Sequence, residues 1–270
     1  MKPLRTSTLC KLSLAIALLL LPCSLAQQPV NSPASYSDTP TIAEQYLFTA
    51  ANQERGARGL PLLQRDPQLA RAAAQHAQVM AEHASISHQF PGEPDLSTRG
   101  AAMGVAFSLI SENVAEAPSA VQIHDMWMHS PGHRANLLDP EVNVVGIRVI
   151  ARQGELYAVE DFAKLVPSNT LQQQESAIAA LIAKPGRIAL DRDAGDISAA
   201  RQTCSMSTGY AGTRKPWFTM RFTSSNLTQL PSQLKTQLAS GRYHQAAVGA
   251  CTSNSTTPFT GYNIAVLLYP

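Results

Sequence analysis

Apolar residues between positions 41 and 138 recur at the spacing of amphipathic helices, and turn residues separate the segments. Thr41-x-x-Glu44 is a capping-box pattern, in which each residue bonds the other's backbone at a helix start. Asp66-Pro67 combines a capping side chain with a proline suited to the first helical position. Four helices are therefore predicted, beginning at Thr41, Asp66, Pro118-Ser119 and Ser130-Pro131 and ending near residues 56–59, 83, 127 and 138.

The pattern changes after Pro140. Residues 142–150 are rich in β-branched side chains, residues 152–155 form a turn signal, and residues 156–165 predict a second strand. Helices followed by a hairpin are typical of an α+β domain rather than of alternating βαβ units. We place this domain at residues 41–166.

A break at Pro167-Ser168-Asn169 precedes a smaller, mostly β carboxyl-terminal domain, predicted for residues 167–270. Its pattern predicts a short helix at 175–183, a possible second one in the amphipathic stretch 227–238, and strands at 188–190, 218–222, 243–250 and 264–268. No fixed-period repeat is visible in the sequence.

Residues 1–26 have the layout of a secretory signal peptide, with early basic residues, a short apolar run and Ser24-Leu25-Ala26 before the cleavage site. The apolar run is too short to cross a bilayer, which takes about 20 residues. A retained anchor and a lipid on Cys23 are the alternatives. Residues 27–40 are rich in Pro, Ser and Gln and predict a linker. We expect a secreted protein, extracellular or periplasmic.

Loss of residues 1–26 would remove three basic residues and no acidic ones, so the formal charge would fall from +2 to −1. A chain with this balance has no charge bias toward nucleic acid or anionic lipid. Only Cys204 and Cys251 would then stay in the mature chain, and in an oxidising compartment such a pair predicts one disulfide. Two free buried thiols are the alternative.

The chain lacks the G-x-S-x-G, H-E-x-x-H, Walker and G-x-G-x-x-G motifs, which excludes the commonest hydrolase, zincin and nucleotide-binding classes. Six of its seven histidines lie between residues 76 and 133. Histidines inside helices, such as His76, are more often packed or solvated than ligands. His88 and His133 differ because each follows a helix boundary, where sites are commonly built. The helix dipole would also favour the neutral form of His133.

The most specific motif in the chain is the block from Trp127 to Leu138, which reads WMHSPGHRANLL, and the Glu112-Asn113 pair supports it. These motifs resemble the CAP (SCP-like) domain of cysteine-rich secretory and pathogenesis-related proteins, in a bacterial-type member. The resemblance covers about 125 residues in order. It implies an α-β-α sandwich, the CAP fold, with a central cleft.

In the wider family, two histidines and two glutamates line this cleft and can hold a divalent metal. Carried over by position, three of them fall on His88, Glu112 and His133, whereas the second glutamate falls on Ser130. Three such ligands resemble a zinc set with an open fourth position. The alternative, weighed evenly, is a hydrogen-bonded polar cluster that holds no metal. The cleft-lining residues implied besides these ligands are Asn113, Ser130, Arg134 and Glu160.

These residues lead to three hypotheses of function. The first is a non-catalytic secreted module that binds a lipid, glycan or peptide, with or without zinc. The second is a metal-dependent hydrolase of the peptidase kind, but the missing second carboxylate leaves no obvious general base. Glu160 would be a base only if its strand borders the cleft. The third is a cell-envelope or matrix protein whose carboxyl-terminal domain contacts a surface.

Overall fold

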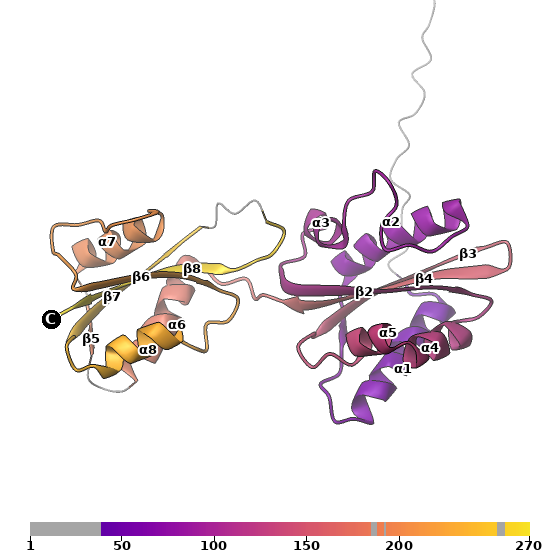
Figure 1. The fold of residues 1–270 in the computed structure, drawn as a ribbon, viewed down its shortest axis with the longest axis horizontal. Helices are drawn as coiled ribbons and strands as arrows, with labels where there is room; N and C mark the ends of the chain where they lie inside the picture. Colours follow the sequence, from indigo (N-terminus) through magenta and orange to yellow (C-terminus); the bar gives the residue numbers. More distant parts are fainter. Residues whose placement is uncertain (1–38, 185–187, 192, 253–256) are drawn as a thin grey trace, which may run out of the picture. The chain divides into compact units, whose positions relative to one another are not determined.

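The computed structural model describes residues 39–184, 188–191, 193–252 and 257–270. The predicted signal peptide and most of the predicted linker lie outside these residues. The described chain contains two four-stranded sheets, A and B, and each is the middle layer between helices on its two faces (Figure 1). This is the expected α+β class, with an α-β-α sandwich followed by a second region built on sheet B.

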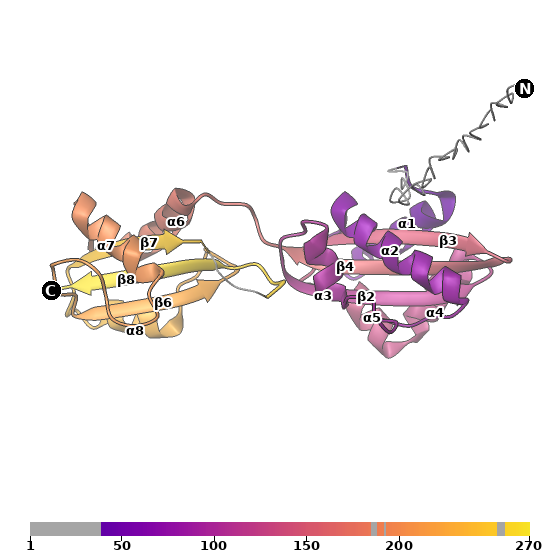
Figure 2. The same cartoon turned by 90° about the horizontal axis from the view of Figure 1, so that it is seen from above.

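Sheet A has the strand order β1-β3-β4-β2, in which β1 runs parallel to β3 and the other pairs are antiparallel (Figure 2). Helices α2 and α3 cover one face, and α1, α4 and α5 cover the other (Figure 1). The elements are α1 (Ile42–Gly56), β1 (Gln64–Arg65), α2 (Pro67–His83), α3 (Leu96–Ala102), β2 (Phe107–Ala117), α4 (Ala120–His129), α5 (Pro131–Leu137), β3 (Val144–Arg152) and β4 (Glu155–Leu165).

The predicted caps are confirmed. Thr41 and Glu44 form a complete capping box at the start of α1, and Asp66 caps α2 by accepting from the amide of Leu69 at 2.7 Å. The second oxygen of Glu44 also accepts from the backbone amide of Val149 on β3, at 3.0 Å. One buried carboxylate therefore starts the helix and fixes it to the sheet.

Trp127 of α4 is fully buried. Its indole nitrogen donates to the carbonyl oxygen of Val114 on β2 at 3.1 Å, so the buried ring is also satisfied as a hydrogen-bond donor. Met128 is partly buried beside it and Met126 is 48% exposed. The ring thus anchors α4 to sheet A.

Sheet B repeats the topology of sheet A. Its strand order is β5-β7-β8-β6, with β5 parallel to β7, and its elements follow each other as helix, strand, helix, strand, helix, strand, strand. Sheet A gives the same order when the short helices α3 and α5 are left aside. The elements are α6 (Leu171–Ala183), β5 (Ala189–Leu190), α7 (Ala194–Cys204), β6 (Phe218–Ser224), α8 (Ser232–Ala239), β7 (Gln245–Cys251) and β8 (Tyr262–Tyr269).

A glycine at matching places shows how closely the two sandwiches correspond. A Cβ on Gly146 of β3 would meet the α2 backbone at Ala70 at 2.3 Å, and one on Gly249 of β7 would meet the α7 backbone at Ala200 at 2.2 Å. Real Cβ atoms do not approach backbone this closely, so only glycine permits the helix to lie on the strand. The sequence showed no repeat because the correspondence is one of topology.

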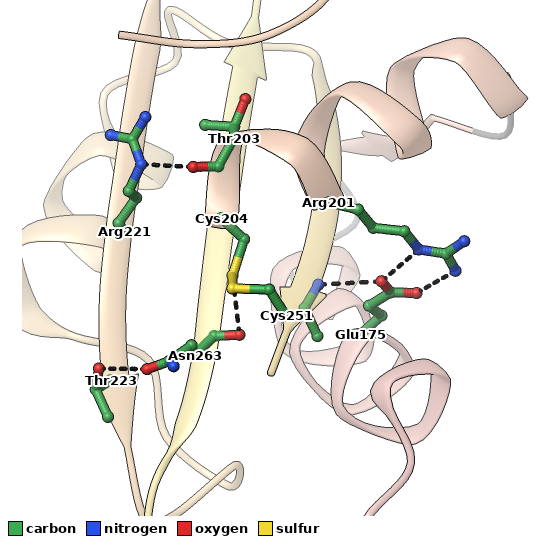
Figure 3. Close-up of a disulfide and its surroundings, with 9 residues drawn as sticks. Glu175, Arg201, Thr203, Cys204, Arg221, Thr223, Cys251 and Asn263 are labelled. Atoms are coloured by element: carbon green, nitrogen blue, oxygen red, sulfur yellow. Dashed lines mark hydrogen bonds and ion pairs between the residues drawn. A yellow bond between two sulfur atoms is a disulfide. The ribbon is translucent and has the colours of Figure 1, made fainter. Parts of the chain in front are cut away.

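The predicted disulfide between Cys204 and Cys251 is present and joins the end of α7 to the end of β7 (Figure 3). Beside it, Arg201 of α7 forms a bidentate pair with Glu175 of α6, both bonds at 2.7 Å. The same carboxylate accepts from the amide of Ala250 at 3.0 Å. Covalent and ionic links therefore converge at this end of sheet B.

Candidate functional site

The candidate site is built around Glu112, in the middle of β2. Because side chains alternate along a strand, Glu112 faces α2 and α3, whereas its neighbour Asn113 faces α5. Glu112 is only 5% exposed, and its register partner on β4 is the fully buried Asp161. A carboxylate in such a place needs partners, since an unpaired buried charge is very costly.

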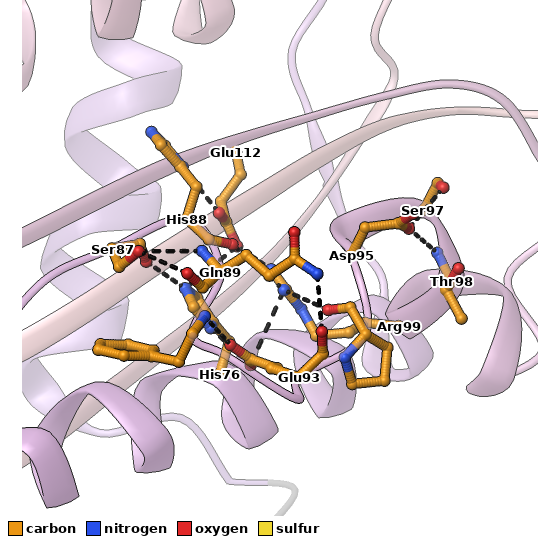
Figure 4. Close-up of polar contacts among 12 residues, drawn as sticks. His76, Ser87, His88, Gln89, Glu93, Asp95, Ser97, Thr98, Arg99 and Glu112 are labelled. Atoms are coloured by element: carbon orange, nitrogen blue, oxygen red, sulfur yellow. Dashed lines mark hydrogen bonds and ion pairs between the residues drawn. The ribbon is translucent and has the colours of Figure 1, made fainter.

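Both oxygens of Glu112 have partners (Figure 4). One lies 2.9 Å from Nδ1 of His88, in the loop after α2. The other accepts from Nη2 of Arg99 on α3 at 2.5 Å, and Arg99 is itself 2% exposed. The structure therefore joins His88 and Glu112, which lie 24 residues apart, and adds a buried arginine that the sequence did not indicate.

A second histidine, His76, belongs to the same polar cluster as His88 and Glu112. His76 of α2 is fully buried, with Nδ1 at 2.7 Å from a Glu93 oxygen and Nε2 at 2.7 Å from the carbonyl oxygen of Ser87. Its Nε2 also lies 3.8 Å from Glu112 (Figure 4). His76 is buried, as expected of a packed helical histidine. It is also part of the polar cluster around Glu112. The sequence signal that could have indicated this role is the place of His76 on the buried stripe of α2.

The surroundings of His88, His133 and Asp161 shift the pKa values of these three groups. The hydrogen bond to Glu112 raises the pKa of His88 above its ordinary value. Burial lowers the pKa of His133, and the charge of His88 lowers it further. Burial, followed by the charge of Glu112, raises the pKa of Asp161 well above its usual range.

The remaining expected cleft residues lie on the other side of β2. Asn113 donates to the carbonyl oxygen of His133 at 3.0 Å and accepts from Asn136 at 3.0 Å, so it fixes α5 to the strand. Ser130 is half-buried at the junction of α4 and α5. Arg134 is exposed and borders a separate surface hollow together with Arg58.

The structure corrects the expectation that Glu160 lines the cleft. It is fully buried between the core residues Ala158 and Phe162 of β4, on the face covered by α1, α4 and α5. Its register partners are Asn113 and Ile147, so strand alternation turns it away from Glu112. Among the described residues neither of its oxygens has a hydrogen-bond partner, and burial raises its pKa to about 8. It therefore neither lines a cleft nor reaches the histidines as a base.

The geometry does not suit the predicted three-ligand zinc set. Within the described part of the chain, no group of three or more His, Cys, Asp or Glu side chains is placed to hold a metal ion. Glu112 already has Arg99 on one oxygen and His88 on the other. Glu112 instead takes part in a hydrogen-bonded cluster in which it orients His88.

The site belongs to sheet A alone. On the α2 face of that sheet, the central cross-strand row consists of Gly146, Asp161 and Glu112. The row at the matching glycine of sheet B reads Gly249, Ala265 and Arg221, and Arg221 donates to the carbonyl oxygen of Thr203 at 2.6 Å. Sheet B thus has a cation where sheet A has carboxylates.

The similarity to known proteins falls on the residues of the sandwich around sheet A. The model of the cysteine-rich secretory protein family, CAP, matches residues 48–162. The uncharacterized protein YkwD of Bacillus subtilis is 26% identical over 121 residues, which are 44% of this chain and 47% of that protein. The chain therefore matches about half the length of this curated relative.

Solved structures are similar over the same share of the chain. An extracellular protein with an SCP domain from Bacillus anthracis is 30% identical, with a TM-score of 0.42, over 45% of this chain and 40% of that one. A cysteine-rich secretory protein from Staphylococcus aureus is 21% identical, with a TM-score of 0.38, over 45% and 38%. No helix among the described residues is long and apolar enough to span a membrane. On the family match and the motif block, residues 48–162 of this chain form a CAP domain of the bacterial type.

Proposed function

We propose that the CAP domain is a secreted, non-catalytic binding module that takes up a small extracellular ligand beside His88 and His133. The observation that carries the proposal is the state of Glu112. Its two oxygens are engaged by Arg99 and His88, so it positions an imidazole and is not free to act as a base. The ring of His88 is 63% exposed and so accessible to a ligand.

A hydrolase has less support from these residues. A general base must come within hydrogen-bond reach of the proton that it removes. Glu160 is fully buried on the other face of the sheet. The exposed imidazole of His88 suits hydrogen bonding to a lipid headgroup, a glycan or a peptide.

The test compares the wild type with the double variant His88→Ala/His133→Ala. Each is titrated calorimetrically with three probe sets: soluble peptidoglycan fragments, neutral oligosaccharides, and fatty acids with lysophospholipids. One class should bind the wild type and bind the double variant at least about tenfold more weakly, the factor that 1.4 kcal/mol represents. His129→Ala is the matched control, because that side chain is 78% exposed and bonds only within α4.

The same preparations are assayed for hydrolysis of casein and of a fluorogenic peptide library, with and without added zinc. We expect rates equal to those without protein. Hydrolysis that is lost in Glu112→Gln would overturn the proposal in favour of the metal-dependent hydrolase. Secretion itself is tested separately, by the amino terminus of the exported protein, which should be Gln27.

A further inference from the structure

We propose that Arg99 is a built-in cation of this site: its guanidinium holds the Glu112 oxygen that a metal ion would need, so the wild-type cluster does not ligate a divalent metal through Glu112. The inference concerns the same residues as the proposed function and adds which cation the site accepts. It starts from burial, because Arg99 and Glu112 have side chains that are each only 2% exposed.

The first argument is the use of the carboxylate. Nη2 of Arg99 lies 2.5 Å from one Glu112 oxygen, and Nδ1 of His88 lies 2.9 Å from the other. A zinc ion binds a carboxylate oxygen at about 2.0–2.2 Å. An ion on the oxygen next to Arg99 would therefore sit within about 5 Å of a fixed positive charge in a buried place, where charges are poorly screened.

The second argument is that Arg99 cannot easily move aside. Its Nη1 donates to the carbonyl oxygens of Pro94 at 3.1 Å and His88 at 3.3 Å, and lies 3.8 Å from Glu93. The guanidinium therefore also fixes the loop that carries His88. A guanidinium keeps its charge at any pH that proteins tolerate, so neither loss of a proton nor side-chain rotation frees Glu112.

These contacts assign Glu112 a positioning role. Its free energy of burial is offset by Arg99, and it accepts a hydrogen bond from Nδ1 of His88, which leaves Nε2 as the free ring nitrogen. The cluster thus keeps its shape with an internal cation.

Zinc chloride is the probe for the test. Full-length secreted protein is stripped with chelator, titrated calorimetrically with zinc, and melted with and without zinc. Glu112→Gln keeps a hydrogen-bond acceptor for His88 and should leave the zinc affinity of the wild type within about threefold, since a lost ligand or outer-shell partner costs about 10–100-fold. Arg99→Lys keeps the charge and should resemble the wild type.

Removal of the Arg99 charge should make the Glu112 carboxylate available to zinc. Arg99→Met should bind zinc at least about tenfold more tightly than the wild type, and zinc should raise its melting temperature more. The gain should disappear in Arg99→Met/Glu112→Gln. If Arg99→Met does not fold, Arg99→Met/Glu93→Gln carries the same comparison, because it buries one carboxylate fewer.

Two results would overturn the inference: a loss of tenfold or more in wild-type zinc affinity on Glu112→Gln, or no gain of zinc binding in the methionine variants. The zinc titrations and the organic-ligand titrations are independent readouts. Loss of ligand binding in His88→Ala/His133→Ala tests the proposed function, and either proposal can fail while the other stands.

Discussion

Glu160→Gln exchanges a buried carboxyl group for an amide of the same shape. The side chain is fully buried in the core of sheet A, and burial raises its pKa from 4.5 to about 8. In the unfolded chain the group loses its proton above pH 4.5, whereas in the folded protein it keeps the proton until about pH 8. Between these values the unfolded state binds fewer protons, so the free energy of unfolding falls as the pH rises.

The size of the effect follows from the shift. One pKa unit corresponds to about 1.4 kcal/mol, so a rise from 4.5 to about 8 corresponds to about 5 kcal/mol of stability lost across this range. Glutamine does not titrate and removes this dependence. The variant should match the wild type near pH 4.5 and exceed its stability increasingly toward pH 8.

Urea denaturation of both proteins, at several pH values between these limits, measures the difference directly. Glu155→Gln, at the half-buried start of the same strand, controls for the loss of a carboxyl group outside the core. Asp161 also has a raised pKa and contributes in the same direction in both proteins, so it cancels in the comparison. A difference between Glu160→Gln and the wild type that stays constant with pH would refute the reasoning.

Two further predictions concern packing and the crosslink. Trp127→Ala should lower the free energy of unfolding by about 3–5 kcal/mol, because it deletes a fully buried ring and its hydrogen bond. In the same denaturation assay, Met126→Ala, at an exposed position, should stay within about 0.5 kcal/mol of the wild type. Cys204→Ser/Cys251→Ser should lower the stability by about 2–4 kcal/mol. A reductant should destabilise the wild type similarly and leave the double variant unchanged; equal melting curves for reduced and oxidised wild type would contradict the prediction.

Local signals made the helices and the hairpin of the CAP domain predictable. Caps such as Thr41 and Asp66 act within one turn, so the sequence alone contains their partners. Strand β2 was missed because helices cover both of its faces and its polar residues interrupt the apolar pattern. Helix α7 was missed because its buried residues, such as Ala199 and Ala200, are small and give little periodic signal.

The candidate site was predictable only in part, for a physical reason. Resemblance of motifs brought together His88 and Glu112, and the structure places them in contact. The charge balance of a buried cluster depends on long-range neighbours, which a linear pattern does not reveal. Arg99 is the case in point, because nothing around it in the sequence indicates that it is buried against Glu112. The expectation that Glu160 lines the cleft was wrong for a related reason. The register of β4 with β2 decides which face of the sheet a residue occupies, and this register is a long-range property.

The second sandwich bears on what the polar cluster is for. Sheet B has the topology of sheet A and the same close approach of a helix to a glycine, yet at the matching row it carries Ala265 and Arg221 in place of the carboxylates. The architecture can therefore form without a buried Glu112 and Asp161. Burial raises the pKa of Asp161, and a buried carboxyl group with a raised pKa makes a fold less stable at neutral pH. Stability of the fold thus does not account for the cluster of sheet A, which favours the binding role that we propose for its exposed member, His88.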